Sequence, residues 1–294
     1  MTEEVKMSKT YVLYNPLANN GRSTEVIENL ARTLEGESIL CDMTKGYADI
    51  VREMQDEDTL VICGGDGTLN RFINEVGAEK VAGDIKYFAC GSGNDFAHDI
   101  SLERDAAPVS IKKHLLGLPE VEIDGKSYKF LNAIGFGIDG YCCEEGDRVR
   151  AATPGKKVDY TAIAIKGVFG KYKPRNAKIT VDGVTKEYKR VWIAPAMHGR
   201  YYGGGMIAAP ERSRDDRETL SLVVWHGSRK LKTLMVFPSI FKGEHVKETK
   251  YVDVIVGKEI TVEFDTPCAL QVDGETVLGV KSYTAKVKVP ATIA

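Results

Sequence analysis

The first 125 residues alternate short, continuous apolar runs with segments whose apolar residues recur at helical spacing. The helical segments are "STEVIENLARTLEG", "YADIVREMQ" and "LNRFINEV", and the β-rich runs around them are "TYVLYN", "SILCD", "TLVIC" and "KYFAC". Strands that are apolar on both faces are typical of a parallel sheet with helices on either side. The pattern therefore predicts an α/β domain over residues 1–125.

After about Glu120 the pattern changes to a succession of β signals. "KSYKFLNAIGFG" is predicted as a strand and Val158 to Gly170 as a helix, and an Asp-Gly hairpin turn is predicted at Asp182-Gly183. Further β-type runs are "TLSLVVW", "YVDVIVG", "EITVEFD", "CALQVDGETV" and "KSYTAKVKV". We expect a mostly antiparallel second domain over residues 126–280.

Composition and charge indicate an ordinary globular protein and exclude several classes of function. The chain has 43% hydrophobic and 28% charged residues, and 40 Lys and Arg nearly balance 42 Asp and Glu, so no global basic field favours nucleic acid as a partner. The six cysteines form no C-x-x-C pair, which favours buried free thiols in a reducing compartment. The start of the chain lacks the apolar core of a signal peptide, and no run is long enough to span a membrane. We expect a cytoplasmic location.

Three predicted strands of the first domain are followed by loops rich in glycine or asparagine. These loops are Asn15 to Ser23, Gly64 to Thr68 ("GGDGT") and Gly91 to Phe96 ("GSGNDF"). Glycines let backbone N–H groups approach phosphate oxygens, and the start of the next helix adds a positive dipole end. A single loop of this kind would be read as a tight turn, but three at successive strand ends favour a phosphate site. The spacing matches neither a P-loop nor a dinucleotide fingerprint.

Asp66 lies inside one of these loops, where a carboxylate would repel phosphate unless a cation lies between them. Magnesium prefers one or two carboxylates together with phosphate oxygens and water, so Asp66 is a candidate metal ligand. Asp95 is a second candidate. For both residues the alternative is a helix N-cap, a common role of aspartate.

The motifs, taken in order, resemble the diacylglycerol kinase catalytic family of lipid kinases, which includes sphingosine and ceramide kinases. The matching stretches are "NP…G" (Asn15, Pro16, Gly21), "GGDGTLN", "GSGNDFA", "NAIGFGIDG", "YYGGGM" and "DGE" (Asp273 to Glu275). The resemblance implies an NAD kinase/diacylglycerol kinase-like α/β domain with a parallel sheet, rejoined by residues 281–294. It also implies a β-sandwich-like second domain and an active site in the cleft between the two.

The resemblance further implies that ATP and Mg2+ are used to transfer the γ-phosphoryl group to a lipid hydroxyl. It assigns the nucleotide to Asn15, Pro16, Gly21, Thr44, Gly64, Gly65, Gly67, Thr68, Gly91, Ser92, Gly93 and Asn94. Catalysis is assigned to Asp66, Asp273 and Glu275, and metal binding to Asp66, Asp95 and Asp216. Some bacterial members bind a structural magnesium at an Asp-Gly turn of the second domain. Here that region reads "PERSRDDRETLSL", which leaves Asp215 or Asp216 as the candidate ligand.

The acceptor hydroxyl needs a carboxylate to take its proton, and "QVDGETV" offers two. If this segment is extended, Asp273 and Glu275 point to the same side, and both would face the acceptor. The alternative from spacing alone is a hairpin turn at Asp273-Gly274. The resemblance favours a catalytic role, with Glu275 placed ahead of Asp273 as the base.

A lipid kinase without a membrane span must meet its substrate at a membrane surface, here the inner face of the cell membrane. Two segments combine basic and apolar residues, Asp147 to Lys178 and Ser228 to Lys247. The alternative for each is a core-facing helix with a solvated basic side. The lipid acceptor and the oligomeric state stay open, a homodimer included. The competing functions are an NAD kinase and a nucleotide-binding regulator without catalysis.

Overall fold

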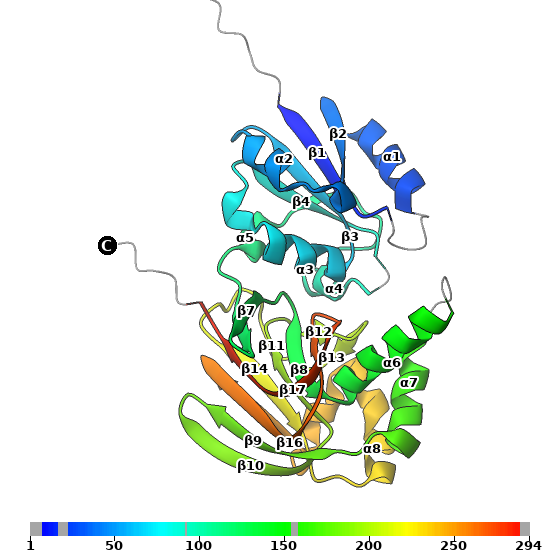
Figure 1. The fold of residues 1–294 in the computed structure, drawn as a ribbon, viewed down its shortest axis with the longest axis vertical. Coiled ribbons are helices and arrows are strands. Elements are labelled where there is room, and N and C mark those ends of the chain that lie inside the picture. The colour runs from blue at the N-terminus through cyan, green and yellow to red at the C-terminus, as the bar shows by residue number, and fades with distance from the viewer. Residues whose placement is uncertain (1–7, 17–22, 92, 154–157, 289–294) are drawn as a thin grey trace, which may run out of the picture. The chain divides into compact units, whose positions relative to one another are not determined.

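A computed structural model describes residues 8–16, 23–91, 93–153 and 158–288 of the chain (Figure 1). The chain divides into two compact units, Met1–Leu116 and Gly117–Ala294. The boundary falls before the expected one at residue 125, because the strands formed by residues 120–129 pair with the second sheet. Each unit has its own sheet and core.

The first unit is a five-stranded sheet in the order β2-β1-β3-β4-β5. Its strands and helices are β1 (Lys9–Tyr14), α1 (Ser23–Thr33), β2 (Glu37–Asp42), η2 (Met43–Lys45), α2 (Ala48–Glu53), β3 (Thr59–Gly64), α3 (Asp66–Glu75), η3 (Ala78–Lys80), β4 (Asp84–Ala89), α4 (Asp95–Asp99), β5 (Val109–Ser110) and α5 (Lys112–Leu115). The first four strands pair in parallel, as the apolar runs predict, and only the two-residue β5 is antiparallel.

The order of the strands in this sheet places its loops in a particular way. The chain runs from β1 to its neighbour β2 and then returns to β3 on the other side of β1. Right-handed crossovers then put α1 on one face and α2 and α3 on the other. The reversal occurs between β1 and β3, and the carboxyl ends of strands around such a switch point are where open α/β sheets bind ligands.

One face of this sheet is covered by α1, whose apolar residues follow the predicted helical spacing. Ile27 and Leu30 pack with Val12, Val61 and Phe88 of the three central strands. Val12 and Val61 are partners in the parallel register of β1 and β3, so they present their side chains to the same face. The sequence pattern thus determines which face of each strand the helix covers.

The second unit is built on a ten-stranded sheet in which every pairing among the described strands is antiparallel. Its elements are β6 (Glu120–Ile123), β7 (Lys126–Lys129), β8 (Ala133–Gly137), α6 (Ile138–Ala152), α7 (Tyr160–Lys166), η4 (Gly167–Lys171), β9 (Arg175–Val181), β10 (Val184–Val191), β11 (Ile193–Met197), β12 (Tyr201–Tyr202), β13 (Met206–Ile207), β14 (Leu220–Trp225), α8 (Lys230–Val236), η5 (Phe237–Lys242), η6 (Glu244–Lys247), β15 (Val252–Gly257), β16 (Glu259–Val272) and β17 (Glu275–Lys286). The strands β12 and β13 form a separate two-stranded sheet.

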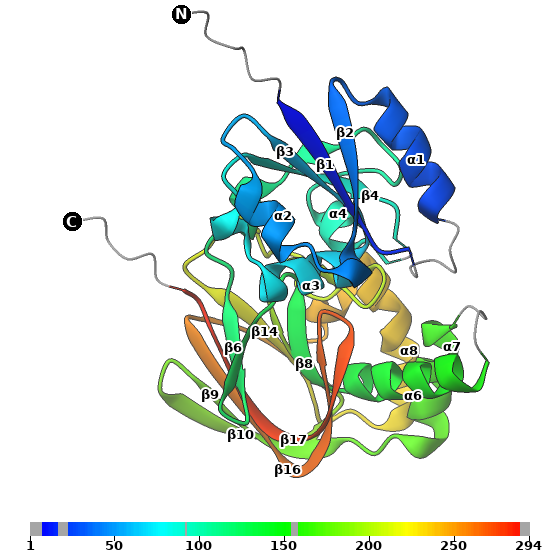
Figure 2. The same cartoon turned by 45° about the horizontal axis from the view of Figure 1, so that its top comes forward.

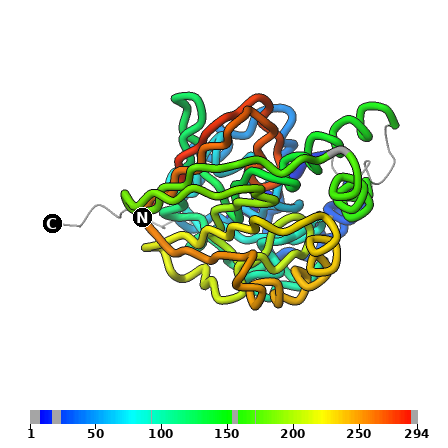
Figure 3. The backbone as a smooth tube through the Cα atoms, turned by 90° about the horizontal axis from the view of Figure 1, so that it is seen from below, coloured from blue at the N-terminus to red at the C-terminus, as the bar shows by residue number. Residues whose placement is uncertain are grey.

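The long strand β16 organises this second sheet because its two halves pair with different partners. Its first half pairs with β9 and its last residues pair with β8, while β17 runs beside it throughout. The register with β17 shifts around Cys268, which is the irregularity expected where a strand bends. Figures 2 and 3 show the curved strands, with α6, α7 and α8 at one end of them.

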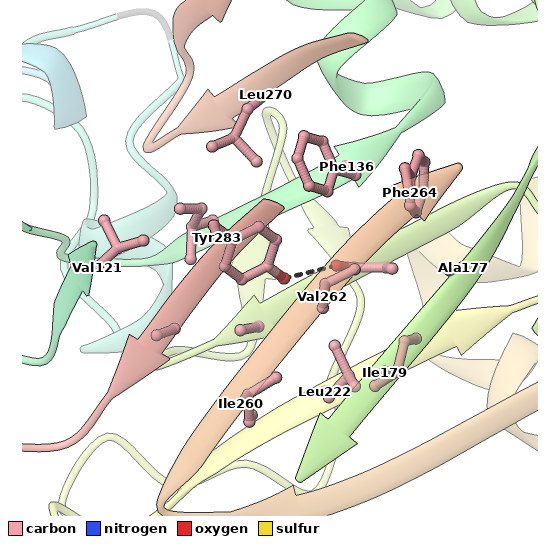
Figure 4. Packing of buried hydrophobic residues seen from close by; sticks show 14 of the residues in the cluster. Val121, Phe136, Ala177, Ile179, Leu222, Ile260, Val262, Phe264, Leu270 and Tyr283 are labelled. Atoms are coloured by element: carbon pink, nitrogen blue, oxygen red, sulfur yellow. Dashed lines mark hydrogen bonds between the residues drawn. The ribbon is translucent and has the colours of Figure 1, made fainter. Parts of the chain in front are cut away.

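The main core of the second unit lies between these curved strands. Phe136 from β8, Phe264 from β16 and Tyr283 from β17 meet there, with ring centroids 4.8 and 5.3 Å from Phe136 (Figure 4). The buried hydroxyl of Tyr283 donates to the carbonyl of Ala194 at 2.9 Å, which satisfies its one polar group. A buried aromatic cluster therefore holds several strands of this unit together.

Three sequence expectations differ from the structure of the second unit. The predicted strand over residues 126–137 is two strands, β7 and β8, separated by a turn. The helix α6 was not expected, because "IDGYCCEEGDRVRAA" has a weak apolar period. Residues 281–286 belong to β17, which pairs with β16 and β6 inside the second unit. The predicted helix at Val158 to Gly170 is found as α7 and η4.

Candidate functional site

The carboxyl ends of the four parallel strands collect the loops that the sequence singled out. Tyr14 of β1 is in register with both Asp42 of β2 and Cys63 of β3, and Gly64 of β3 with Ala89 of β4. The segments that follow these strand ends include Asn15-Pro16, Thr44, Gly64–Thr68 and Gly91–Asp95. The predicted nucleotide residues therefore share one edge of the sheet. Gly21 and Ser92 lie outside the described residues.

Two glycines allow the loops after β3 and β4 to touch. A Cβ atom added to Gly91 would lie 2.3 Å from the Cα of Gly65, and one added to Gly65 would lie 3.1 Å from the Cα of Gly91. The carbonyl of Gly64 accepts hydrogen bonds from the N–H groups of Cys90 and Gly91, both at 3.0 Å. These glycines therefore serve the contact between the two loops as well as any approach of a ligand.

Asp66 links the same two loops through its carboxylate. Oδ2 accepts from the N–H of Asp95 at 2.8 Å, and Oδ1 accepts from the N–H of Phe96 at 2.9 Å. These N–H groups open α4, so Asp66 caps a helix 29 residues further along the chain. Asp66 therefore does act as a helix cap, which was the alternative to metal binding. The helix that it caps is α4, and not the helix α3 in which Asp66 itself lies.

Asn94 carries an unpaired acceptor at this junction. Its side-chain N–H group donates to the carbonyl of Gly91 at 2.9 Å, which fixes the orientation of the amide. The Asn94 Oδ1 atom is buried and has no hydrogen-bond partner among the described residues. A buried acceptor in this state is suited to a donor that arrives with a ligand, such as a water or a hydroxyl group. Asp95 is buried beside it, with 6% of its surface exposed.

Thr44 is exposed at the end of β2, where a short local network holds it. Both its N–H and its hydroxyl donate to Asp42 Oδ1, at 2.8 and 2.7 Å. The hydroxyl and the backbone N–H of Thr44 are the main reasons why the pKa of Asp42 is lowered. The threonine is therefore positioned by an aspartate that the sequence analysis did not single out.

In the second unit, "VDGE" forms the tight hairpin turn between β16 and β17. Val272 pairs with Glu275, and Asp273 and Gly274 have φ angles of 49° and 90°. Two positive φ angles at the central positions define the type I′ turn that Asp-Gly favours. The segment is consequently not extended at Asp273. Asp273 and Glu275 therefore do not face the same side by strand alternation, because a turn lies between the two strands.

The carboxylate of Asp273 is occupied by the backbone of a distant segment. Oδ1 accepts from the N–H groups of Asn132 at 2.7 Å and Ala133 at 3.0 Å, and Oδ2 accepts from the N–H of Leu131 at 2.5 Å. Three N–H groups directed at one carboxylate form a compact anion-binding arrangement. Asp273 therefore fastens the hairpin to the segment before β8.

The other side of that segment is held by residues that the sequence analysis missed. Arg214 is buried, and it donates to the carbonyl of Leu131 and to Asn132 Oδ1, both at 2.7 Å. His198 Nδ1 lies 3.0 Å from the same Leu131 carbonyl. Burial first, and then the nearby Arg214, lower the pKa of His198 to about 3, so the ring is neutral. The sequence feature that could have indicated this role is the set of arginines in "ERSRDDR", a segment that the sequence analysis interpreted only for its aspartates.

Glu275 differs from Asp273 in both exposure and contacts. Its side chain is exposed, and the carboxylate makes no hydrogen bond or ion pair with any residue that the structure describes. The next residue, Thr276, donates to Asp147 of α6 at 2.6 Å, so the hairpin is tied to that helix. Of the two carboxylates, Glu275 is the one whose oxygens are available to a substrate.

The surroundings of Asp216 differ from those expected for a metal ligand. Its Oδ2 accepts from Arg212 Nη1 at 2.7 Å and from the Thr219 hydroxyl at 2.5 Å, and its Oδ1 accepts from the N–H of Glu218 at 2.9 Å. The Arg212 guanidinium also donates to the carbonyls of Asp216, Thr219 and His198. The buried Arg212 guanidinium already binds the oxygens of this turn that would have to coordinate a metal. The residues present therefore do not fit a magnesium ion here.

The described residues contain neither a cluster of three or more metal-ligating side chains nor a helix that could cross a membrane. Within residues 8–16, 23–91, 93–153 and 158–288, no group of three or more His, Cys, Asp or Glu side chains is placed to hold a metal ion. In the same ranges, none of the helices has the length and apolar character needed to cross a membrane.

Comparison with known proteins follows the division into two units. Residues 9–120 match the model of the diacylglycerol kinase catalytic domain, and residues 132–293 match the model of the YegS C-terminal NAD kinase beta sandwich-like domain. A Bacillus subtilis protein named as a candidate lipid kinase, YtlR, is 24% identical over 92% of this chain and 94% of its own length. A diacylglycerol kinase of Mycobacterium tuberculosis is 23% identical over 88% of this chain and 86% of its own.

A solved structure shares the fold over the whole chain. The crystal structure of a diacylglycerol kinase from Bacillus anthracis strain Sterne is 20% identical and superposes with a TM-score of 0.63, covering 99% of this chain and 100% of that chain. The resemblance inferred from the ordered motifs is confirmed by the two matched models, which follow each other in the same order. The chain belongs to the lipid kinase family in which a diacylglycerol kinase catalytic domain is followed by a YegS-type β-sandwich-like domain.

Proposed function

We propose that this protein transfers the γ-phosphoryl group of ATP to a hydroxyl group of a lipid. The observation that carries the proposal is the difference between the two carboxylates of the "DGE" hairpin. Asp273 is used by the backbone, whereas Glu275 is exposed and unpaired among the described residues. Transfer to a lipid hydroxyl needs a carboxylate that can take the hydroxyl proton, and the Glu275 side chain is available for that role.

The nucleotide side of the reaction is proposed for the loops after β1, β3 and β4. Gly64–Thr68 opens α3, a ten-residue helix whose N-terminal N–H groups favour phosphate. The N–H groups of Asp95 and Phe96 bind Asp66 instead, so they are not the ones proposed to contact phosphate. Asp66 fixes the relative position of the two loops that would hold ATP.

Magnesium fits this edge of the sheet better than it fits Asp216. Asp66 and Asp95 supply carboxylates, and the unpaired Asn94 Oδ1 can accept from a water molecule bound to the ion. When bound with ATP, the ion would offset negative charge on the phosphates.

The base is proposed to be Glu275. The lipid oxygen attacks the γ-phosphorus, the bond from that phosphorus to the β-phosphate oxygen breaks, ADP leaves, and the hydroxyl proton passes to the Glu275 carboxylate. Asp273 is a positioning residue, because its three hydrogen bonds hold the turn from which Glu275 projects. The loops proposed for the nucleotide belong to the first unit, and the proposed base belongs to the second.

A panel of acceptors tests this function. The protein is incubated with magnesium and ATP labelled at the γ-phosphate, together with diacylglycerol, undecaprenol, a sphingoid base, phosphatidylglycerol or NAD. Labelled lipid from the wild type, and about 10²-fold less or lower from Glu275→Gln, is the expected result. Labelled NADP would identify an NAD kinase, and no product with any acceptor would favour a nucleotide-binding regulator. Either result would contradict the proposal.

A further inference from the structure

Two segments of the second unit are basic and contain no acidic residue. Tyr160–Lys173 and Arg229–Lys242 together hold seven Lys and Arg residues and no Asp or Glu. The first covers α7 and η4, and the second covers α8 and η5. Nearly 60 residues separate them in the sequence, so their composition alone does not place them together.

The structure brings these segments side by side. The ammonium group of Lys230, at the start of α8, donates to the carbonyl of Phe169 in η4 at 3.2 Å. The elements α8 and η4 pack against each other at one end of the curved strands (Figure 1). We call the exposed residues of the two segments the docking surface; its large apolar and aromatic members are Tyr160, Ile165, Phe169, Leu231, Met235 and Phe241.

The apolar members of the docking surface are unusually exposed for large side chains. Leu231, Met235 and Phe169 expose 72%, 70% and 67% of their surface. Leu231 and Met235 are four residues apart on α8 and share its outer side, while Thr233 and Val236 of the same helix are buried. The core therefore uses one side of α8 and leaves apolar side chains on the other.

The charges around these side chains select the kind of partner. Lys166, Arg229, Lys230 and Lys242 are exposed. In the second segment, Lys232 is balanced by Glu248 at 2.8 Å. Flexible cationic side chains around protruding Phe, Leu and Met are the pattern of interfacial membrane binding, with the ammonium groups at anionic headgroups and the apolar groups below them. A symmetric contact with a second copy would set basic residues against basic residues, which disfavours it.

The docking surface is connected to the hairpin that carries Glu275. α7 packs on α6, and Asp147 of α6 accepts the hydrogen bond from Thr276, the residue next to Glu275. The docking surface is thus linked to this turn through α6, by the packing of α7 on α6 and by the hydrogen bond between Asp147 and Thr276. We propose that the docking surface seats the second unit on a bilayer containing anionic lipid; this deepens the proposed function and rests on it for the identity of the acceptor.

Vesicle flotation tests the proposal without requiring turnover. The full-length protein is mixed with vesicles of phosphatidylcholine alone, or of phosphatidylcholine with phosphatidylglycerol, at low and high salt. The test variant is Phe169→Ser/Leu231→Ser/Met235→Ser, whose positions are exposed and outside the core. Val184→Ser/Val256→Ser is the matched control, because these residues are also apolar and 74% and 58% exposed, but lie on β10 and β15.

The expected result is binding of the wild type and of the control to the anionic vesicles, weakened by salt. The triple variant is expected to bind about tenfold or more weakly, because each buried apolar side chain contributes roughly a tenfold factor when fully inserted. Wild-type binding to both vesicle types alike, binding to neither, or undiminished binding of the triple variant would overturn the proposal. So would a wild-type dimer that the triple variant converts to a monomer.

Failure of docking and failure of the proposed function are distinguishable. A short-chain diacylglycerol presented as a soluble monomer needs no membrane, so phosphorylation of it by the triple variant at the wild-type rate is expected. Loss of that activity in the triple variant alone would show that the substitutions damage the enzyme and would count against the docking role. Absence of that activity in the wild type would refute the kinase function, whatever the flotation result.

Discussion

The Asp273 carboxylate accepts the backbone N–H of Asn132 at 2.7 Å, across 141 positions of sequence. The same carboxylate also accepts from the N–H groups of Leu131 and Ala133, and the N–H of Asp273 donates to the carbonyl of Ala133. The motif "NAIGFG" thus begins at the anchor of the "DGE" hairpin. Two motifs that the sequence presents as separate are one structural unit.

Asp273→Asn should lower the free energy of unfolding of the second unit by about 2 kcal/mol or more, because hydrogen bonds to a charged acceptor contribute about 1.5–3 kcal/mol each and an amide cannot accept all three. Asparagine tolerates the positive φ at this position, so the decrease in the free energy of unfolding measures the loss of the carboxylate and not a change in the turn. Urea denaturation measures it. Asp124→Asn, in the equivalent Asp-Gly turn between β6 and β7, is the control and should change stability little.

Glu275→Gln should behave in the opposite way. The free energy of unfolding should stay within about 0.5 kcal/mol of the wild type, because the side chain is exposed and without a partner among the described residues. Turnover of the lipid substrate should fall about 10²-fold or more, since a general base contributes a factor of that order. Steady-state kinetics with ATP titration would check that kcat falls while the KM for ATP is kept. Near-normal turnover would remove Glu275 as the base.

Gly91→Ala should separate the two loops that contact each other after β3 and β4. The new Cβ would lie 2.3 Å from Gly65 Cα, so the backbone must move, at a cost of about 1–3 kcal/mol. ATP affinity, measured by isothermal titration calorimetry, should fall with stability. Gly93→Ala is the matched control two residues away, because its Cβ would meet nothing nearer than Asp66 Oδ2 at 3.4 Å. Equal effects of the two substitutions would contradict the close-contact account.

Arg212→Met should destabilise the second unit by about 3 kcal/mol or more, because it leaves the carboxylate and carbonyls around a buried guanidinium unpaired. Arg148→Met, which removes an exposed ion-pairing arginine from α6, should cost about 1 kcal/mol or less. Chelation by EDTA should leave the wild-type Tm unchanged, since an arginine holds the turn at Asp216. A fall in Tm with EDTA that occurs in the wild type but not in Asp216→Asn would contradict this account and indicate a metal at Asp216.

Asp139, at the start of α6, should make stability fall with rising pH. Burial raises its pKa from 3.8 to about 7, against the smaller lowering effect of the Gly140 N–H. The folded state therefore holds a proton that the unfolded state has lost between about pH 4 and 7, so stability declines through this window, by at most about 1.4 kcal/mol per pH unit. The neighbours that share its surroundings are Cys142, Cys143, Tyr172, Cys268 and Tyr283, all neutral there.

Asp139→Asn removes the titrating carboxyl group and keeps a side-chain oxygen that can accept from the Gly140 N–H. Thermal unfolding of both proteins from pH 5 to 8 should show a decline in the wild type that the variant lacks, and a higher Tm for the variant at pH 8. Parallel pH profiles would mean that Asp139 titrates in the folded state as it does in the unfolded chain.

Much of the fold follows from local pattern. The alternation of apolar runs with amphipathic segments predicts β1 to β4 with their helices, because each strand is buried on both faces and each helix on one. Asp182-Gly183 predicts a hairpin because a type I′ turn needs two positive φ angles. The α6 helix escaped prediction because it packs through small residues: a Cβ on Gly140 would lie 2.2 Å from the carbonyl of Ala269. Close backbone contact leaves no apolar period to detect.

The sequence by itself determined the strand-end loops, the ordered motifs and the pair of carboxylates at residues 273 and 275. The tertiary structure decided what each carboxylate does. Asp66 and Asp273 bind backbone N–H groups 29 and more than 140 residues away, Asp216 is held by Arg212, and Glu275 stays exposed. A hydrogen bond forms when donor and acceptor meet in space, and such distant partners meet only once the chain has folded. The residue types determine which chemistry is available to the protein. The fold determines which carboxylate oxygens remain exposed and can take part in that chemistry.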